Sequence, residues 1–275
     1  MSKKDLPFTK SDLERIIVKY PTPFHIYDEN AIRENARKMK DAFSWMPGFK
    51  NYYAVKACPN LSIMKILKEE GFGADCSSLP ELILAEKAGI TGENIMFTSN
   101  NTSIAEFSTA LENRGCILNL DDISLIAKID EMPELICFRY NPGPRRKGNK
   151  IIGNPVESKY GISHEQVLPA YKEALEKGAK RFGMHTMLAS NELNHEYMIE
   201  TTKMILDMVD LVSTELNIKF EFINIGGGLG IPYQPEQPSL NIDLMAKGIE
   251  ELLNNFKTSK GFVPKLFMES GRYMT

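Results

Sequence analysis

Residues 50–78 read KNYYAVKACPNLSIMKILKEEGFGADCSS, and this stretch contains the repeating unit that decides the fold. Its first part, KNYYAVK, is rich in aromatic and β-branched residues, which favour a β-strand. The middle part, LSIMKILKEEG, has the spacing of an amphipathic helix and closes on a glycine, as helix C-termini prefer. The last part, GADCSS, is a second strand candidate. A strand, a helix and a strand in this order predict parallel strands joined by a crossover helix.

The same alternation continues along the chain. Helix-like segments such as residues 78–89 and 103–115 separate short apolar runs, and the longest expected helix extends from about Asn191 to Asn217. A closed (β/α)8 barrel of roughly 250 residues fits this length, and an open doubly wound sheet is the competing architecture. The barrel is favoured because no G-x-G-x-x-G follows the first strand. The remaining strand candidates are NIMFTS, CILNLD, LICFRY, RFGMH, FEFINIG and PKLFMES.

The pattern divides the chain into two parts. Residues 1–28 form an N-terminal segment that contains the strand-like run FHIYD, and residues 29–275 form the barrel, beginning with a helix from about Glu29 to Trp45. The one long irregular segment covers residues 141–161, and a loop of that length in a compact domain is expected to be functional or mobile.

Composition excludes several classes of protein. The chain has a net charge of -3, with 43% hydrophobic and 25% charged residues, so no basic excess points to nucleic acid or an anionic membrane surface. The N-terminus lacks the apolar core of a secretory signal, and no run approaches the roughly 18 apolar residues of a membrane span. Four widely spaced cysteines and four histidines show no metal-ligand spacing, so we expect a cytoplasmic protein with reduced thiols and no metal site.

Unusual residues gather where the predicted strands end. In a barrel of this kind the active site lies at the carboxyl ends of the strands. These ends carry charged residues, a histidine and glycines: Lys56, Asp75, Arg139, His185, Gly226, Gly227, Gly228, Glu269, Gly271 and Arg272.

The run INIGGGLGIPY, residues 223–233, contains the three consecutive glycines. Successive backbone N–H groups without side chains can turn towards a phosphate, whereas a flexible turn is the alternative interpretation. The loops after the seventh and eighth strands of such barrels commonly bind phosphate, which favours the anion site. Arg272 would add a charged hydrogen bond to the same anion.

Lys56 is the residue that suggests a cofactor. Most lysines are solvated surface groups, but a lysine at a strand end that faces a phosphate site can form a Schiff base with an aldehyde. Pyridoxal 5'-phosphate supplies both the aldehyde and the phosphate. Glu269 would pair with the pyridine nitrogen, unless it forms a structural ion pair. His185 would contact the ring, unless it is simply a buried core histidine.

Five motifs in this order resemble the alanine-racemase-type pyridoxal-phosphate barrels, and within them the diaminopimelate decarboxylase branch. They are YYAVKA, GADCSSLPEL, SKYGI, INIGGGLGIPY and ESGR. The resemblance implies that Lys56 carries the cofactor and that His185 stacks on the ring face opposite the substrate. It implies that Glu269 pairs with the ring nitrogen, where racemases have an arginine, and that Asp75 and Arg139 form a supporting charged shell. The implied phosphate ligands are Gly226, Gly227, Gly228, Gly271 and Arg272.

The sequence departs from the family pattern at several positions. Ser270 stands where proline is usual, and Leu79-Pro80 replaces a pair of glycines. After His185 the usual Gly-Ser is replaced by TMLAS, residues 186–190, so a phosphate-contacting serine is missing and Ser190 is the candidate substitute. Members of the family also follow the barrel with a β domain that completes the active site and the dimer. We expect that domain to be absent from this chain, residues 24–28 to be a strand that would join it, and the truncated chain to be weakly active or inactive.

The resemblance implies decarboxylation of an amino-acid substrate, meso-2,6-diaminopimelate to L-lysine and CO2, by a protein that is a homodimer in its full-length form. The continuation GLGIPY favours this substrate over ornithine or arginine. Two other classes remain open. One is a non-catalytic barrel that binds pyridoxal phosphate. The other is a sugar or nucleotide enzyme that keeps the glycines and Arg272 but gives Lys56 no role.

Overall fold

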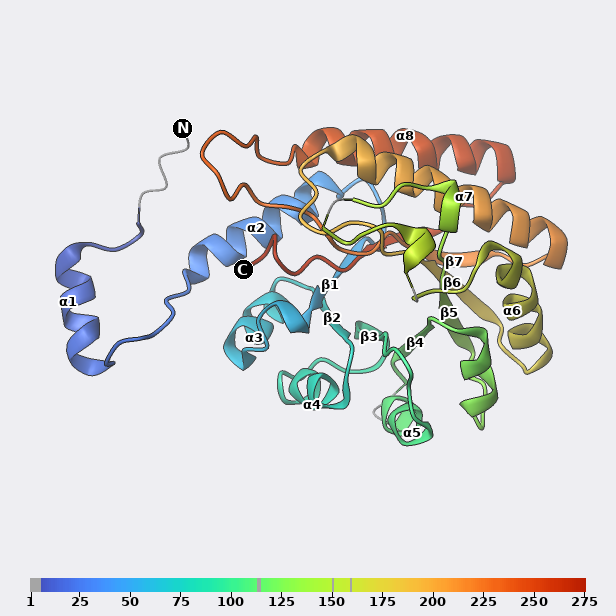
Figure 1. Ribbon diagram of the computed structural model, residues 1–275, viewed down its shortest axis with the longest axis horizontal. Coiled ribbons are helices and arrows are strands. Elements are labelled where there is room, and N and C mark those ends of the chain that lie inside the picture. The colour runs from blue at the N-terminus through green and yellow to red at the C-terminus, as the bar shows by residue number, and fades with distance from the viewer. Residues whose placement is uncertain (1–5, 113–114, 150, 159) are drawn as a thin grey trace.

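The computed structural model describes residues 6–112, 115–149, 151–158 and 160–275. The chain forms a closed barrel of parallel strands in sequence order, in which β8 pairs back with β1 (Figure 1). The barrel prediction is therefore confirmed over the open sheet. The strands are β1 Lys50–Ala54, β2 Gly73–Cys76, β3 Ile95–Phe97, β4 Ile117–Leu120, β5 Leu135–Arg139, β6 Arg181–His185, β7 Phe220–Asn224 and β8 Lys265–Met268.

Helices surround the barrel (Figure 1). They begin mostly after a polar residue whose side chain accepts from the first free backbone N–H groups, such as Asp28, Asn60 and Asn241. Between β4 and β5 the crossover is a 3-10 helix, η3 Ile123–Lys128. The α-helices around the barrel are α2 Glu29–Ala42, α3 Leu61–Glu69, α4 Leu79–Lys87, α5 Ile104–Glu112, α6 His164–Glu176, α7 His195–Leu216 and α8 Ile242–Lys260.

Two expected helices are shorter than the sequence predicted. The helix expected to end near Trp45 stops at Ala42. The helix expected from Asn191 begins at His195, because Asn191 adopts a left-handed φ of 50° and the Asn194 side chain caps the helix by accepting from the backbone N–H of Glu196. These differences leave residues 186–194 as a loop at the mouth of the barrel.

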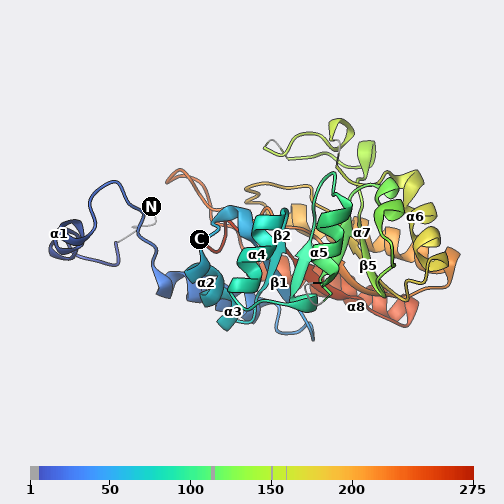
Figure 2. The same ribbon diagram turned by 90° about the horizontal axis from the view of Figure 1, so that it is seen from below.

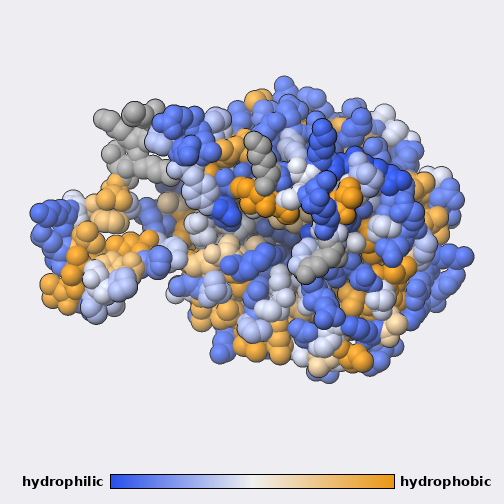
Figure 3. Space-filling model, in the orientation of Figure 1, coloured by the Kyte–Doolittle hydropathy of each residue, from blue (hydrophilic) through white to orange (hydrophobic). Residues whose placement is uncertain are grey.

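The N-terminal segment differs from the prediction. It contains a helix, α1 Lys10–Lys19, which buries none of its residues and projects from the barrel in both Figures 1 and 2. Figure 3 shows apolar side chains on this projecting part, where Ile17, Val18 and Tyr20 are exposed. Residues 24–28 form no strand in this structure. Their pairing with a further domain remains a prediction.

The barrel interior has an apolar layer and a polar layer. Gly183 leaves room in the apolar layer for the ring of Phe222, which stacks on Phe267 with 4.5 Å between ring centroids. Towards the carboxyl ends of the strands the buried side chains become polar and charged, and this end carries the site described below. The apolar layer consists of Tyr52, Met96, Ile117, Leu135, Cys137, Phe222 and Phe267. Among the described helices, none is long and apolar enough to cross a membrane.

Candidate active site

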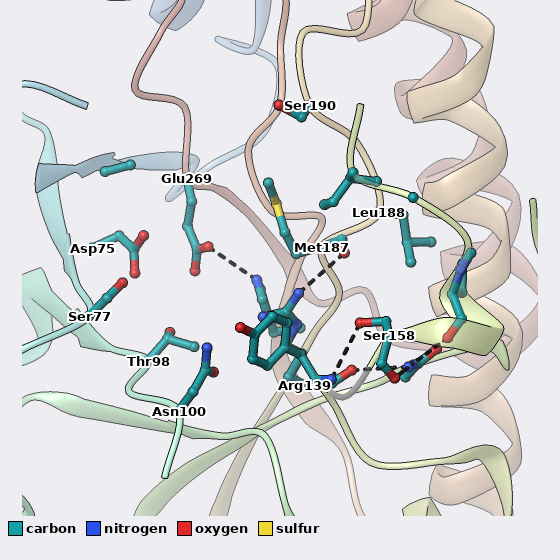
Figure 4. Close-up of a pocket in the computed structure, with 18 of the residues that line it drawn as sticks. Asp75, Ser77, Thr98, Asn100, Arg139, Ser158, Met187, Leu188, Ser190 and Glu269 are labelled. Atoms are coloured by element: carbon teal, nitrogen blue, oxygen red, sulfur yellow. Dashed lines mark hydrogen bonds and ion pairs between the residues drawn. The ribbon is translucent and has the colours of Figure 1, made fainter. Parts of the chain in front are cut away.

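A cavity of about 900 Å³ opens at the carboxyl ends of the strands. Its wall is built from the loops that follow the strands, including the described part of the long loop 141–161 (Figure 4). Most of the predicted site residues line it: Lys56, Asp75, Arg139, His185, Gly228, Glu269, Gly271 and Arg272. The carboxyl ends of the strands therefore bring together residues that are more than 200 positions apart in the sequence, as the sequence predicted.

Lys56 and Asp75 form an ion pair on one side of the cavity. Lys56 lies in the 3-10 turn η1 Val55–Ala57, just beyond β1, and its Nζ is 3.0 Å from Asp75 Oδ2. The same amine donates to Ser77 Oγ at 3.3 Å. Asp75 is 1% exposed, and within the described chain its Oδ1 has no hydrogen-bond partner. Burial raises the pKa of Asp75 to about 7 although Lys56 opposes this, while the charge of Asp75 raises the pKa of Lys56.

Glu269 is held by two side chains from neighbouring strands. His185 Nε2 lies 3.1 Å from Glu269 Oε2, and Asn224 Nδ2 donates to Glu269 Oε1 at 2.8 Å. Burial raises the pKa of Glu269, but His185 and the positive charges of Lys56 and Arg139 outweigh it and keep the pKa below its ordinary value. Because a carboxylate can only accept, His185 Nε2 carries the proton. Glu269 therefore offers a fixed negative charge to the cavity.

Arg139 lies between this carboxylate and the loop after β6. Its guanidinium donates to the backbone carbonyl of Met187 at 3.4 Å and lies over the ring of Tyr160, 5.4 Å from the centroid (Figure 4). Burial lowers its pKa, whereas Glu269 and two aspartates, Asp121 and Asp75, favour the charged form. Arg139 thus adds a second positive charge to the cavity that Lys56 lines.

The three glycines are only partly where the sequence predicted them. Gly226 and Gly228 have φ of 75° and 87°, which glycine adopts without strain, and a Cβ at Gly227 would lie 2.3 Å from the carbonyl oxygen of Glu269. Gly228 lines the cavity, but Gly226 and Gly227 are buried behind the wall. The backbone N–H of Gly227 donates to Met187 Sδ at 3.2 Å. Within the described chain the cavity therefore meets the glycine run at Gly228 alone.

Two further features of the wall concern the expected phosphate site. Arg272 is exposed, and its guanidinium donates to the hydroxyl of Tyr233. Ser190, the expected substitute for the missing serine, lines the cavity, and its backbone carbonyl accepts from Asn149 Nδ2 at 2.7 Å. This bond ties the long loop to the loop after β6, next to Gly228.

Asn224 and Met187 were missed by reasoning from the sequence. Asn224 is fully buried at the end of a strand, so a polar residue inside an apolar run was a usable signal. Met187 left no such signal in the sequence, because its contact with Gly227 depends on how the loop after β6 packs against the loop after β7. Among the described residues, no cluster of three or more histidine, cysteine, aspartate or glutamate side chains could hold a metal ion.

The residues present fit pyridoxal phosphate. The cavity combines a lysine amine paired with a buried carboxylate, a second carboxylate that stays ionised, and a wall that contains Gly228, Gly271 and Arg272. An aldehyde, a basic ring nitrogen and a phosphate each find a group of matching chemistry. The unpartnered buried Asp75 Oδ1 is also explained if a polar ligand group occupies this cavity.

Comparison with known proteins places the chain in a family. Residues 29–275 match the family described as "Pyridoxal-dependent decarboxylase, pyridoxal binding domain". The chain is 40% identical to "Protein TabA" of Pseudomonas amygdali pv. tabaci, covering 96% of this chain and 62% of that protein. It is 35% identical to diaminopimelate decarboxylase of Methanothermobacter thermautotrophicus, over 96% of this chain and 63% of that enzyme.

Solved structures agree with this assignment. Diaminopimelate decarboxylase from M. jannaschii, solved in complex with L-lysine, is 28% identical with a TM-score of 0.85, over 94% of this chain and 63% of that one. The chain thus spans about 63% of the length of such relatives. The predicted cofactor and the predicted family are confirmed. The chain belongs to the pyridoxal-dependent decarboxylases, in the family of their pyridoxal-binding domain.

Proposed function

We propose that this protein decarboxylates an amino acid, with meso-2,6-diaminopimelate as substrate and L-lysine and CO2 as products. The observation that carries the proposal is the pairing of Lys56 with Asp75 in the same cavity as the ionised Glu269. Bound pyridoxal phosphate supplies an aldehyde and an electron-accepting ring, and the protein must hold both in place. The family assignment supports this reaction class.

Lys56 is proposed to hold the cofactor through its amine. An ammonium group is no nucleophile, so Nζ must first lose a proton. Asp75 Oδ2 lies 3.0 Å away, and its pKa of about 7 makes it a stronger base than an ordinary carboxylate, so it can take up that proton transiently although its charge also raises the pKa of Lys56. After the proton moves, the buried Asp75 is neutral and the amine is free to react. Asp75 is therefore proposed to prepare Lys56 for attachment.

Glu269 is proposed to hold a proton on the ring nitrogen of the cofactor. Its pKa is kept low, so it remains a carboxylate and favours the positively charged form of its partner. Asn224 fixes the orientation of the carboxylate from the neighbouring strand. By this means Glu269 would strengthen the electron-accepting character that the bound cofactor supplies for decarboxylation. An arginine at this position would not hold such a proton, so the glutamate supports decarboxylation rather than racemisation.

The remaining predicted residues are proposed to orient the cofactor. His185 would contact the ring of the cofactor, and Arg139 would neutralise negative charge near Lys56. The proposed phosphate ligands are Gly226, Gly227, Gly228, Gly271 and Arg272, of which Gly228, Gly271 and Arg272 line the cavity in this structure. Ornithine and arginine remain the alternative substrates. A barrel that binds the cofactor without turnover is the alternative function.

A substrate panel tests the proposal. The full-length protein is loaded with pyridoxal phosphate and given meso-diaminopimelate, ornithine or arginine, and released CO2 and amine product are measured by mass spectrometry. We expect the highest kcat/KM for meso-diaminopimelate. Lys56→Ala should abolish turnover, whereas Lys87→Ala, which changes an exposed lysine of α4, should not. Turnover by Lys56→Ala would refute the proposed role of this lysine. Cofactor attachment without turnover of any substrate would favour the non-catalytic barrel.

The oligomeric state is implied by the resemblance, and the location by the four widely spaced cysteines. We propose that the full-length protein is a homodimer in the cytoplasm. Sedimentation of that protein as a monomer at micromolar concentration would contradict the dimer.

A further inference from the structure

Met187 separates part of the glycine run from the cavity. Its side chain is partly exposed and lines the cavity, while the Gly227 N–H behind it donates to Met187 Sδ at 3.2 Å. The Met187 sulfur also packs closely against Gly226, since a Cβ placed on Gly226 would lie 2.9 Å from it. The thioether therefore occupies the position from which a ligand in the cavity would reach the Gly227 N–H.

The main chain and the side chain of Met187 are held differently. Its backbone carbonyl accepts from the partly buried guanidinium of Arg139 at 3.4 Å, and the preceding residue, Thr186, donates from its hydroxyl to the carbonyl of Tyr140 at 3.0 Å. The side chain, in contrast, faces the 900 Å³ cavity (Figure 4). Methionine is unbranched and flexible, so the side chain can turn into the cavity while the loop stays fixed.

The hydrogen bond that would be lost is a weak one. A thioether sulfur is a weak acceptor, whereas a phosphate oxygen is charged and forms a shorter and stronger bond with a backbone N–H. The Gly226 N–H already donates to Asn224 Oδ1 at 2.9 Å, so the N–H of Gly227, which within the described chain is held only by the thioether, is the one that a phosphate can take over. An entering phosphate can therefore replace the sulfur at Gly227 with a net gain.

We propose that Met187 is a displaceable cover of the phosphate site, and that it sets how strongly the site prefers a phosphorylated ligand. This inference rests on the proposed function, because it assumes that the glycine run holds the phosphate of the cofactor. In the covered state only Gly228 of the run meets the cavity. In the uncovered state the N–H of Gly227 also faces the cavity. The binding free energy of the phosphate thus includes the displacement of Met187.

A pair of ligands without an aldehyde isolates this effect. Pyridoxine 5'-phosphate and pyridoxine differ only in the phosphate, and neither can attach to Lys56, so calorimetric titration of both into the chain yields a preference ratio that is independent of turnover. Met187→Ala removes the cover and should raise the ratio of the affinity for pyridoxine 5'-phosphate to that for pyridoxine. The expected rise is about two- to tenfold, which corresponds to the free energy of one ordinary hydrogen bond. Met187→Gln keeps the length but offers a stronger acceptor, so it should lower the ratio.

Leu188→Ala is the matched control. Leu188 is the next residue of the same wall and lines the cavity without contacting the Gly227 N–H, so this change should leave the ratio unaltered. Thermal unfolding checks that each variant is folded. Equal ratios for the wild type, Met187→Ala and Met187→Gln would overturn the inference. If these ratios are equal while pyridoxal phosphate still attaches to Lys56, the proposed function stands. If no attachment occurs, the proposed function itself fails.

Discussion

Replacing Asp75 by asparagine should make the cofactor-free protein more stable at neutral pH. The wild-type carboxyl is buried, and its pKa is raised from 3.8 to about 7, so the folded state binds this proton more tightly than the unfolded state does. The stabilisation by the proton is complete below about pH 4 and is lost as the pH rises through 7. A rise of this size corresponds to as much as about 4 kcal/mol of unfolding free energy. Asparagine has nearly the same shape, carries no charge and does not titrate.

The assay is thermal unfolding of both proteins between pH 4 and 8.5, followed by circular dichroism. We expect similar Tm values near pH 4 and a Tm for Asp75→Asn that is higher by several degrees at pH 8. Asp41→Asn, at an exposed site, is the control and should show no such trend. A Tm difference between wild type and Asp75→Asn that does not grow with pH would refute the argument that burial of this carboxylate is costly.

Three other substitutions test different parts of the structure. Gly183→Ala places a methyl 2.0 Å from the ring of Phe222, so it should cost about 1–3 kcal/mol of stability, and an unchanged urea midpoint would contradict the packing described. Asn149→Ala removes the bond to the Ser190 carbonyl and loosens the wall beside Gly228, so KM should rise more than kcat falls, and an unchanged KM would argue against a role for this contact. Glu269→Gln cannot hold a proton on the ring nitrogen, so decarboxylation should be largely lost while the cofactor still attaches, and full activity would exclude the proposed role.

Local patterns predicted the barrel well, for a physical reason. Each strand and each crossover helix must bury an apolar face, and that requirement appears in the sequence as a short apolar run or an amphipathic period. Because active sites of such barrels lie at the carboxyl ends of the strands, the sequence also predicted that five polar residues share one cavity, as observed. They are Lys56, Asp75, Arg139, His185 and Glu269. These inferences needed only the order of elements and the polarity of the residues that end them.

Features that depend on packing between distant segments were not predicted. Residues 24–28 have strand-like composition, but a strand needs a partner, and none of the described residues provides one. Burial of Gly227 behind Met187 depends on how the loop after β6 lies against the loop after β7. The helix α1 did leave a local signal, since Thr9 and Asp12 form a capping box at its start.

Attachment of the cofactor to Lys56 is the central claim, and one measurement tests it directly. The chain is incubated with pyridoxal phosphate, reduced with borohydride and digested, and the modified peptides are mapped and quantified by mass spectrometry. We predict one pyridoxyl group per chain on Lys56, with little modification of exposed lysines such as Lys87. Equal labelling of many lysines with no enrichment at Lys56 would contradict the account, because the ion pair with Asp75 would then have no part in holding the cofactor.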